Sequence, residues 1–155
     1  MNRELILLIG SNIQPEKNIA RALDLLRRQF TINRQSSIWE TEPYHSLGDN
    51  FLNLAISIKT DMSRENLRSL LRKIEADLER VRTEDKFAPR TMDIDIILDG
   101  ELVVDEKLWI FGFVAVPVSQ LEPNLVSPTT RLTLQQIARK LIKKSRIVEY
   151  PAHIE

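Results

Sequence analysis

Two aspartates, Asp93 and Asp95, stand in the segment FAPRTMDIDIILDG, which otherwise has the pattern of a buried strand. Side chains of a strand alternate between its faces at about 3.3 Å per residue, so both carboxylates are expected on one face, roughly 7 Å apart. Met92, Ile94 and Ile96 then take the other face. Two like charges so placed raise each other's pKa unless a cation compensates them. Either solvent or a bound ligand supplies that compensation.

Basic residues precede this pair along the chain: Arg80, Arg82, Lys86 and Arg90. Two hard carboxylates suit Mg²⁺, which takes one or two protein oxygens and completes its coordination with water and substrate phosphates. Arginine binds phosphate through two parallel hydrogen bonds. The combination therefore indicates phosphoryl transfer. The competing interpretation is a solvated strand face, with the arginines paired to acidic residues of the preceding helix.

The amino-acid composition and net charge exclude several classes of protein function. The 155 residues are 43% hydrophobic and 28% charged, which predicts one soluble domain over residues 1–155. With 22 basic and 22 acidic residues the net charge is zero, which argues against a nucleic-acid or membrane-surface binder. The chain has no cysteine and two histidines, which excludes disulfides, catalytic thiols and multi-histidine zinc sites. The start lacks a signal peptide's apolar core, so we expect a cytoplasmic protein.

Hydrophobic periodicity predicts the elements that position these residues. Strands are expected at 4–9, 31–41, 51–60 and within 87–100, with GELVVD as a hairpin partner of the last. The strict alternation of FLNLAISIKT predicts a half-buried strand. Helices are expected after Pro15, after the N-cap Ser63 and after a capping box of Thr133 and Gln136.

The order of these elements is β, α, β, β, α, β, followed by a C-terminal helix. This order predicts an α+β fold of the ferredoxin-like sandwich type, with a mostly antiparallel sheet and helices packed on its faces. Such a fold does not by itself specify a reaction.

Several spaced motifs resemble one known family. The longest is RVRTEDKFAPRTMDIDIILDG at 80–100, and the others are IGSN at 9–12, SSIWETEP at 36–43, FLN at 51–53, IEADLERVR at 74–82 and VPVSQLEPNLVSP at 116–128. In this order they resemble the 6-hydroxymethyl-7,8-dihydropterin pyrophosphokinases of folate biosynthesis, over residues 5–128. The resemblance implies transfer of pyrophosphate from ATP to the hydroxymethyl group of the dihydropterin, with release of AMP.

The resemblance also implies roles for individual residues. Asp93 and Asp95 match the ligands of two Mg²⁺ ions, and Arg80, Arg82 and Arg90 match catalytic positions that hold the nucleotide. The expected ATP contacts are Glu75, Arg80, Arg82, Lys86, Phe87 and Arg90. The expected pterin contacts are Thr41, Pro43, Tyr44, Phe51, Asn53 and Phe113. On periodicity alone, core packing is slightly favoured for Phe51 and Phe113, and the resemblance reverses that preference.

The chain departs from the family pattern on the nucleotide side. After Asp105 the family has a longer segment with a Pro-His pair and then an arginine before Gly-Phe, whereas this chain runs DEKLWIFGF and has Phe111 at the arginine position. Phe87 also replaces a tryptophan of the family loop. Two hypotheses therefore stand: a pyrophosphokinase with a trimmed nucleotide site, or a noncatalytic pterin-binding or regulatory relative of the same fold. Only small-molecule partners are expected, and the sequence gives no oligomeric state.

Overall fold

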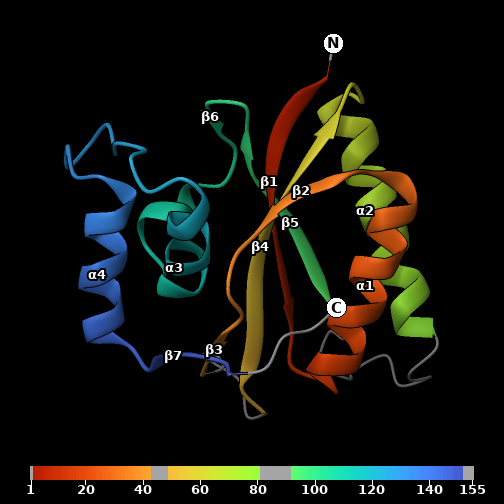
Figure 1. Cartoon of the computed structure of the whole chain (residues 1–155), viewed down its shortest axis with the longest axis horizontal. Coiled ribbons are helices and arrows are strands. Elements are labelled where there is room, and N and C mark those ends of the chain that lie inside the picture. The colour runs from red at the N-terminus through yellow and green to blue at the C-terminus, as the bar shows by residue number, and fades with distance from the viewer. Residues whose placement is uncertain (1, 43–48, 81–91, 152–155) are drawn as a thin grey trace.

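A seven-stranded antiparallel sheet with helices on both faces forms the frame of the protein, as the computed structural model shows (Figure 1). The structure describes residues 2–42, 49–80 and 92–151. Its strands are β1 (Arg3–Ser11), β2 (Ile32–Gln35), β3 (Trp39–Thr41), β4 (Phe51–Thr60), β5 (Asp93–Asp99), β6 (Leu102–Val103) and β7 (Ile147–Glu149). Its helices are α1 (Pro15–Gln29), α2 (Arg64–Arg80), α3 (Gly112–Leu121), α4 (Leu134–Lys144) and the short 3-10 helix η1 (Glu106–Trp109).

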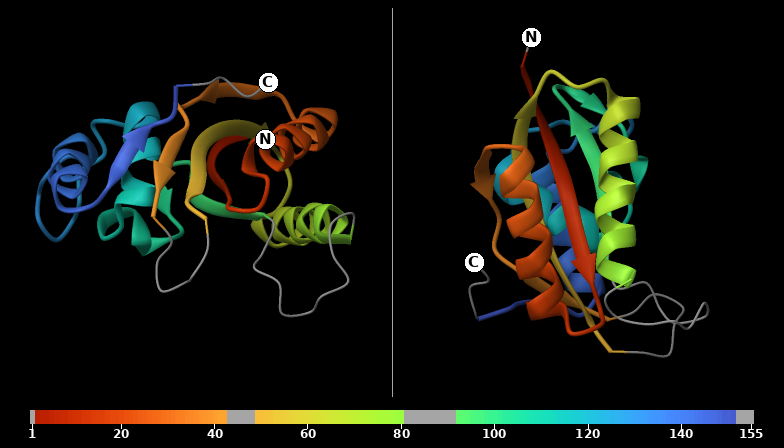
Figure 2. Two further views of the ribbon diagram at one scale, coloured as in Figure 1. Left: turned by 90° about the horizontal axis from the view of Figure 1, so that it is seen from below. Right: turned by 90° about the vertical axis from the view of Figure 1, so that its right-hand side faces the viewer.

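The sheet order is β6-β5-β1-β4-β3-β7, and β2 pairs separately with β4. Helices α1 and α2 cover one face, while α3 covers the other with α4 outside it (Figure 2). The central strand β1 is consequently buried on both sides: Leu5, Leu7 and Ile9 belong to the core under α1 and α2, and Ile6 and Leu8 to the core under α3. This arrangement confirms the predicted α+β class.

The predicted helix starts are confirmed. Pro15 opens α1, where its missing N–H costs nothing. The Ser63 hydroxyl accepts a hydrogen bond from the backbone N–H of Asn66 at 3.1 Å, and Thr133 and Gln136 form the reciprocal capping box of α4. None of the helices among the described residues is both long and apolar enough to cross a membrane.

Three expectations about the strands and about the helices that pack on them were wrong or incomplete. The single strand expected over 31–41 is two strands, because the chain between β2 and β3 leaves the ladder and the Ser36 hydroxyl takes the backbone N–H of Ala55 instead. Strand β4 is buried on both faces, whereas alternation predicted a half-buried strand. Helix α3, η1 and β7 were not predicted; α3 is buried nearly all round and contains Pro117, so it lacks an amphipathic period.

An irregularity in β5 separates its aspartates. The register between β1 and β5 shifts between Ile6 and Leu7, so that Leu98 pairs with Ile6 while Ile96 pairs with Leu7. The extra residue, Ile97, lets consecutive side chains of β5 reach the same core. Asp99 therefore faces α2, away from the face that carries Asp93 and Asp95.

Asp99 binds two arginines on the α2 side. Arg3 Nε and Nη2 donate to its two oxygens at 2.6 and 3.2 Å, and Arg64 Nε donates at 3.1 Å. The Asp99 side chain is 8% exposed. The hydrogen bond from Arg3, followed by that from Arg64, lowers the pKa of the Asp99 carboxyl below its ordinary value. This cluster ties the starts of β1 and α2 to the end of β5.

We expect Asp99→Asn to lower the free energy of unfolding at pH 7 by about 1 to 3 kcal/mol, because two arginines lose a charged acceptor. A lowered carboxyl pKa stabilises the fold above the unfolded value of about 3.9, and that contribution is lost as pH falls through the folded pKa. The difference in free energy of unfolding between the variant and the parent should therefore shrink as pH falls from 5 to 2, as measured by denaturant titrations. Asp77→Asn, on an exposed position of α2, is the control. A gap that is independent of pH would contradict the ion-pair assignment.

Candidate active site

The pairing register brings residues from three strands into one row across the sheet. Gly10 of β1 pairs with Asp93 of β5 on one side and with Asn53 of β4 on the other. The next row along β1 places Leu8 beside Asp95. Neighbouring strands lie about 4.8 Å apart, so Asp93 and Asn53 stand on opposite sides of Gly10 and roughly 10 Å from each other. All of these residues lie on the sheet face that α3 covers in part.

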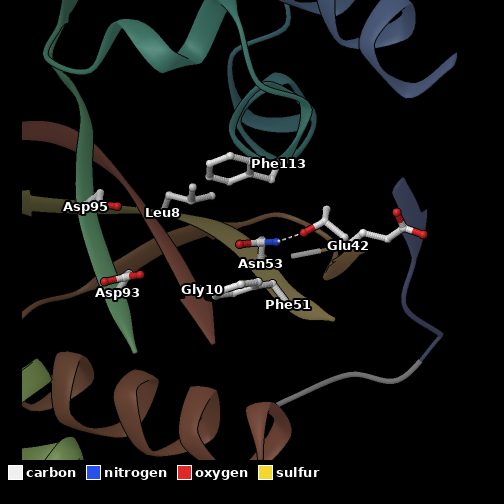
Figure 3. A pocket seen from close by; sticks show the side chains of 9 residues that line it. Leu8, Gly10, Glu42, Phe51, Asn53, Asp93, Asp95 and Phe113 are labelled. Atoms are coloured by element: carbon white, nitrogen blue, oxygen red, sulfur yellow. Dashed lines mark hydrogen bonds between the residues drawn. The ribbon is translucent and has the colours of Figure 1, made fainter. Parts of the chain in front are cut away.

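A cavity of about 180 Å³, called the first cavity below, opens over this row. Its lining residues come from four adjacent strands and from the start of α3: Leu8, Gly10, Thr41, Glu42, Phe51, Asn53, Asp93, Asp95 and Phe113. Figure 3 shows Phe113 and Phe51 on opposite sides of Asn53, with the two aspartates together on β5. The first cavity thus joins an apolar, aromatic end to an anionic end. It also brings together the predicted metal ligands with four of the predicted pterin contacts.

The Asn53 carboxamide is held in one orientation. Its Nδ2 donates to Thr41 Oγ1 at 2.9 Å, and both side chains are buried, Asn53 with 3% exposure. Its Oδ1 lies over Gly10, where an added Cβ would approach it to 2.7 Å. The absence of a side chain at Gly10 is therefore what gives the carboxamide its place in the cavity.

Asp95 stands in an environment that disfavours its charge. Burial raises the pKa of the Asp95 carboxyl above its ordinary value, and the charges of Asp93 and Glu75 raise it further, with Lys107 opposing them. A divalent cation at this position would reverse the effect, since opposite charge stabilises a carboxylate. Among residues 2–42, 49–80 and 92–151, no cluster of three or more acidic or histidine side chains suits a metal. Mg²⁺ needs only one or two protein oxygens, since water and substrate phosphates complete its coordination.

A second cavity of about 360 Å³ adjoins the first at Asp95. It lies between α2 and the edge of β5 and is lined by Arg68, Leu71, Arg72, Ile94, Asp95, Ile96, Val104 and Asp105. Sequence reasoning missed Arg68 and Arg72, although their i, i+4 spacing puts both on the same face of α2. The charged residues of this cavity are Arg68, Arg72, Asp95 and Asp105, and Arg72 also pairs with Glu75.

Glu75, an expected ATP contact, has a structural role. It is 5% exposed, and its Oε2 accepts the backbone N–H of Ile94 at 2.7 Å while Oε1 accepts from Arg72 at 3.0 Å. Strand β6 pairs with β5 only at Leu98 and Asp99, so Glu75 satisfies an N–H on the open edge of β5. Contact of Glu75 with ATP stays a prediction.

The other predicted site residues lie at the end of a described segment or beyond it. Pro43, Tyr44, Arg82, Lys86, Phe87 and Arg90 lie outside the described residues, and of Arg80 only the backbone is described, at the end of α2. The predicted nucleotide contacts of this group therefore stay predictions.

Comparison with known proteins adds an independent observation. Residues 6–123 match the family model described as 7,8-dihydro-6-hydroxymethylpterin-pyrophosphokinase. The chain belongs to this pyrophosphokinase family. The family that the motifs resemble is thereby confirmed, whereas the metal-binding roles of Asp93 and Asp95 stay predictions.

Individual relatives agree with the assignment. The chain is 30% identical to the folic acid synthesis protein FOL1 of Dictyostelium discoideum over 97% of its own length, but it spans only 24% of that protein. It is 29% identical to a 2-amino-4-hydroxy-6-hydroxymethyldihydropteridine pyrophosphokinase of Bacillus subtilis, covering 100% of this chain and 99% of that one. Its fold is similar to a solved Plasmodium falciparum HPPK-DHPS structure, with a TM-score of 0.72 at 12% identity over 93% of this chain and 46% of that one.

Phe111, which stands where the family resemblance predicts an arginine, packs on a residue that lines the first cavity. Phe111 precedes α3, and its ring centroid lies 5.7 Å from that of Phe113 at an interplanar angle of 35°. Aromatic pairs at this separation stabilise each other beyond the area they bury. The Phe111 ring thereby supports the Phe113 ring.

We expect Gly10→Ala to displace the Asn53 carboxamide and to break its hydrogen bond with Thr41. Overpacking of this kind costs about 1 to 3 kcal/mol of stability. The measurement is the side-chain amide resonances of Asn53 in ¹⁵N-correlated NMR spectra, which should shift strongly or broaden. Gly100→Asn is the matched control, because an added Cβ there meets nothing within 4 Å and asparagine tolerates the local φ of 60°. Unchanged Asn53 resonances in Gly10→Ala would contradict the steric role of Gly10.

Proposed function

We propose that the protein transfers the β,γ-pyrophosphoryl group of ATP to the hydroxymethyl oxygen of 6-hydroxymethyl-7,8-dihydropterin and releases AMP. The observation that carries the proposal is the first cavity, in which an aromatic and amide wall for a flat polar ring meets two carboxylates suited to Mg²⁺. Membership of the pyrophosphokinase family supports the reaction class. The proposal treats residues 1–155 as one catalytic domain.

The apolar end of the first cavity is the proposed ring site. Phe51 and Phe113 offer aromatic faces for stacking, and the Asn53 carboxamide offers its polar atoms to the ring edge. Because Thr41 already takes one N–H of that carboxamide, Asn53 presents its oxygen in a fixed direction. Pro43 and Tyr44, next in sequence to Glu42, complete the proposed pterin contacts.

The nucleotide is proposed to lie across Asp95, with its triphosphate reaching the second cavity. Arg68 and Arg72 line that cavity, and Arg80, Arg82, Lys86, Phe87 and Arg90 are the further contacts that the family resemblance implies. Asp93 and Asp95 would hold two Mg²⁺ ions, which when bound neutralise triphosphate charge and lower the pKa of the attacking hydroxyl. The rigid strand β5 fixes the spacing of the two carboxylates before any ligand arrives.

The chemical step is a displacement at the β-phosphorus. The hydroxymethyl oxygen forms a bond to this phosphorus, the bond to the oxygen bridging the α-phosphorus breaks, AMP leaves with that oxygen, and the hydroxyl proton passes to solvent. The residues of the chain act by holding the ring, by aligning its hydroxymethyl group with the phosphates and by excluding water from the cavity. Positioning of this kind supplies most of the catalysis in phosphoryl transfer.

The direct test is incubation of the protein with ATP, Mg²⁺ and 6-hydroxymethyl-7,8-dihydropterin, followed by chromatography of the nucleotides. The proposal expects AMP and the pterin diphosphate ester in equal amounts. Binding of the pterin without AMP formation would overturn the proposal and favour the noncatalytic pterin-binding or regulatory relative.

Removing either carboxylate should abolish most turnover while the fold survives. Asp93→Ala and Asp95→Ala are each expected to lower kcat by at least about 100-fold, since each loses a group that stabilises developing charge. Melting temperatures should not fall in Asp95→Ala, because a buried charge with a raised pKa is removed. Glu101→Gln, an exposed acid in the β5–β6 turn, serves as the control and should keep full activity. Turnover retained in both aspartate variants would refute the metal assignment.

The departure at Phe111 should appear in the nucleotide kinetics. An arginine acting on transition-state charge is worth roughly 10³ to 10⁵ in rate, and Phe111 supplies no charge. We expect a KM for ATP above about 1 mM, or a chemical step well below the typical enzyme median of about 10 s⁻¹, in steady-state and single-turnover kinetics. Ordinary turnover at micromolar ATP would show that other cations hold the nucleotide. Phe111→Arg is a poor gain-of-function probe, because it removes the ring that packs on Phe113.

A further inference from the structure

The C-terminal strand β7 lies outside the segment that matches the family, yet it reaches the walls of the first cavity. The match ends at residue 123, whereas α4 and β7 follow it. Strand β7 pairs with β3 and places Ile147 opposite Thr41, the hydrogen-bond partner of Asn53. In the described sheet β7 is the last strand beyond β3, as Figure 1 shows.

Ile147 also fits closely against the start of α3. Gly112 is the first residue of α3 and is buried, and an added Cβ there would lie 2.2 Å from Ile147 Cδ1. Only a residue without a side chain allows the two segments to approach so closely. The next residue, Phe113, lines the first cavity. Ile147 is itself 8% exposed and belongs to the core against which Phe113 packs.

Ile147 thus adjoins the supports of two parts of the cavity wall, one through its backbone and the other through its side chain. Its backbone pairs opposite Thr41, which holds the Asn53 carboxamide, and its Cδ1 lies against Gly112, the residue before Phe113. A nearby ion pair, Arg146 with Glu42 at 3.5 Å, joins β7 to the cavity rim, but both side chains are exposed, so it contributes little. The apolar contact is therefore the one that can fix the separation of the walls.

We propose that Ile147 is a positioning residue for the pterin site, acting through its contact with Gly112 to set the distance between Phe113 and the Thr41–Asn53 pair. This inference rests on the proposed pterin-binding function. It gives the C-terminal strand a part in binding the pterin ring. Nucleotide binding is expected not to depend on Ile147, because Ile147 does not line the second cavity.

A pair of complementary substitutions tests the contact. Ile147→Val removes Cδ1 and leaves Ile147 Cγ1 at 3.6 Å and Leu141 Cβ at 3.5 Å from an added Cβ at Gly112, both ordinary contacts. Among the described glycines, only Gly100 has a positive φ. The backbone of Gly112 therefore has a conformation that alanine can adopt. Gly112→Ala alone should therefore push α3 and β7 apart, and the double variant should restore their packing.

The readouts are dissociation constants for 6-hydroxymethylpterin and, separately, for α,β-methylene-ATP with Mg²⁺. Gly112→Ala is expected to weaken pterin binding about tenfold and nucleotide binding by less than about twofold. Adding Ile147→Val should bring pterin affinity back to within about threefold of the parent. The control pair, Gly112→Ala with Ile6→Val, alters another isoleucine of the same core and should give no rescue.

The outcomes separate the two claims. Failure of the unmodified protein to bind 6-hydroxymethylpterin would overturn the proposed function and this inference with it. Normal pterin binding by folded Gly112→Ala, an equal loss for both ligands, or absence of rescue by Ile147→Val would overturn the inference alone. If Gly112→Ala does not fold, Ile147→Ala makes the test by opening the contact instead of crowding it, and unchanged pterin affinity in that variant would overturn the inference.

Discussion

The register of β5 on β1 and of β1 on β4 is the constraint on which the site depends. Because side chains alternate along a strand, a slip of one residue would turn Asp93 and Asp95 into the core under α1 and α2 and bring Ile94 to the opposite face. Burial of β1 on both faces makes such a slip costly, since each face has its own set of tightly packed apolar residues. The row formed by Asp93, Gly10 and Asn53 is thus fixed by the hydrophobic core and needs no ligand to assemble it.

Charge is divided between the two faces of the sheet by the irregularity at Ile97. Without it, strict alternation would place Asp99 on the same face as Asp93 and Asp95, and three like charges would share one surface. With it, Asp99 turns to Arg3 and Arg64 and stabilises the fold, while the other two remain beside the cavities. The charge of Asp99 is thus compensated by two arginines of the protein itself. Asp95 instead has a raised pKa, because it is buried and lies near the charges of Asp93 and Glu75.

Much of this could be predicted from the sequence, and the failures have physical reasons. The helices α1, α2 and α4 carry strong periodic and capping signals, and the aspartate pair stands out because charge interrupts an apolar strand. Helix α3 gave no signal, because burial on all sides erases the amphipathic period. The half-buried prediction for β4 failed because alternation in FLNLAISIKT reflects polar residues of the site, such as Asn53, and not exposure to water. The role of Arg68 and Arg72 and the contact of Ile147 with Gly112 depend on packing between distant segments, which local patterns do not encode.

The central claim is that one pair of carboxylates on β5 serves two adjoining cavities, one for the pterin ring and one for the nucleotide. The measurement that tests it most directly is a crystal structure of the protein with Mg²⁺, α,β-methylene-ATP and 6-hydroxymethylpterin. The account predicts metal ions about 2.0 to 2.1 Å from oxygens of Asp93 and Asp95, with the ring between Phe51 and Phe113 and the phosphates beside Asp95. A ring bound elsewhere, or metal ions held by other residues, would contradict it.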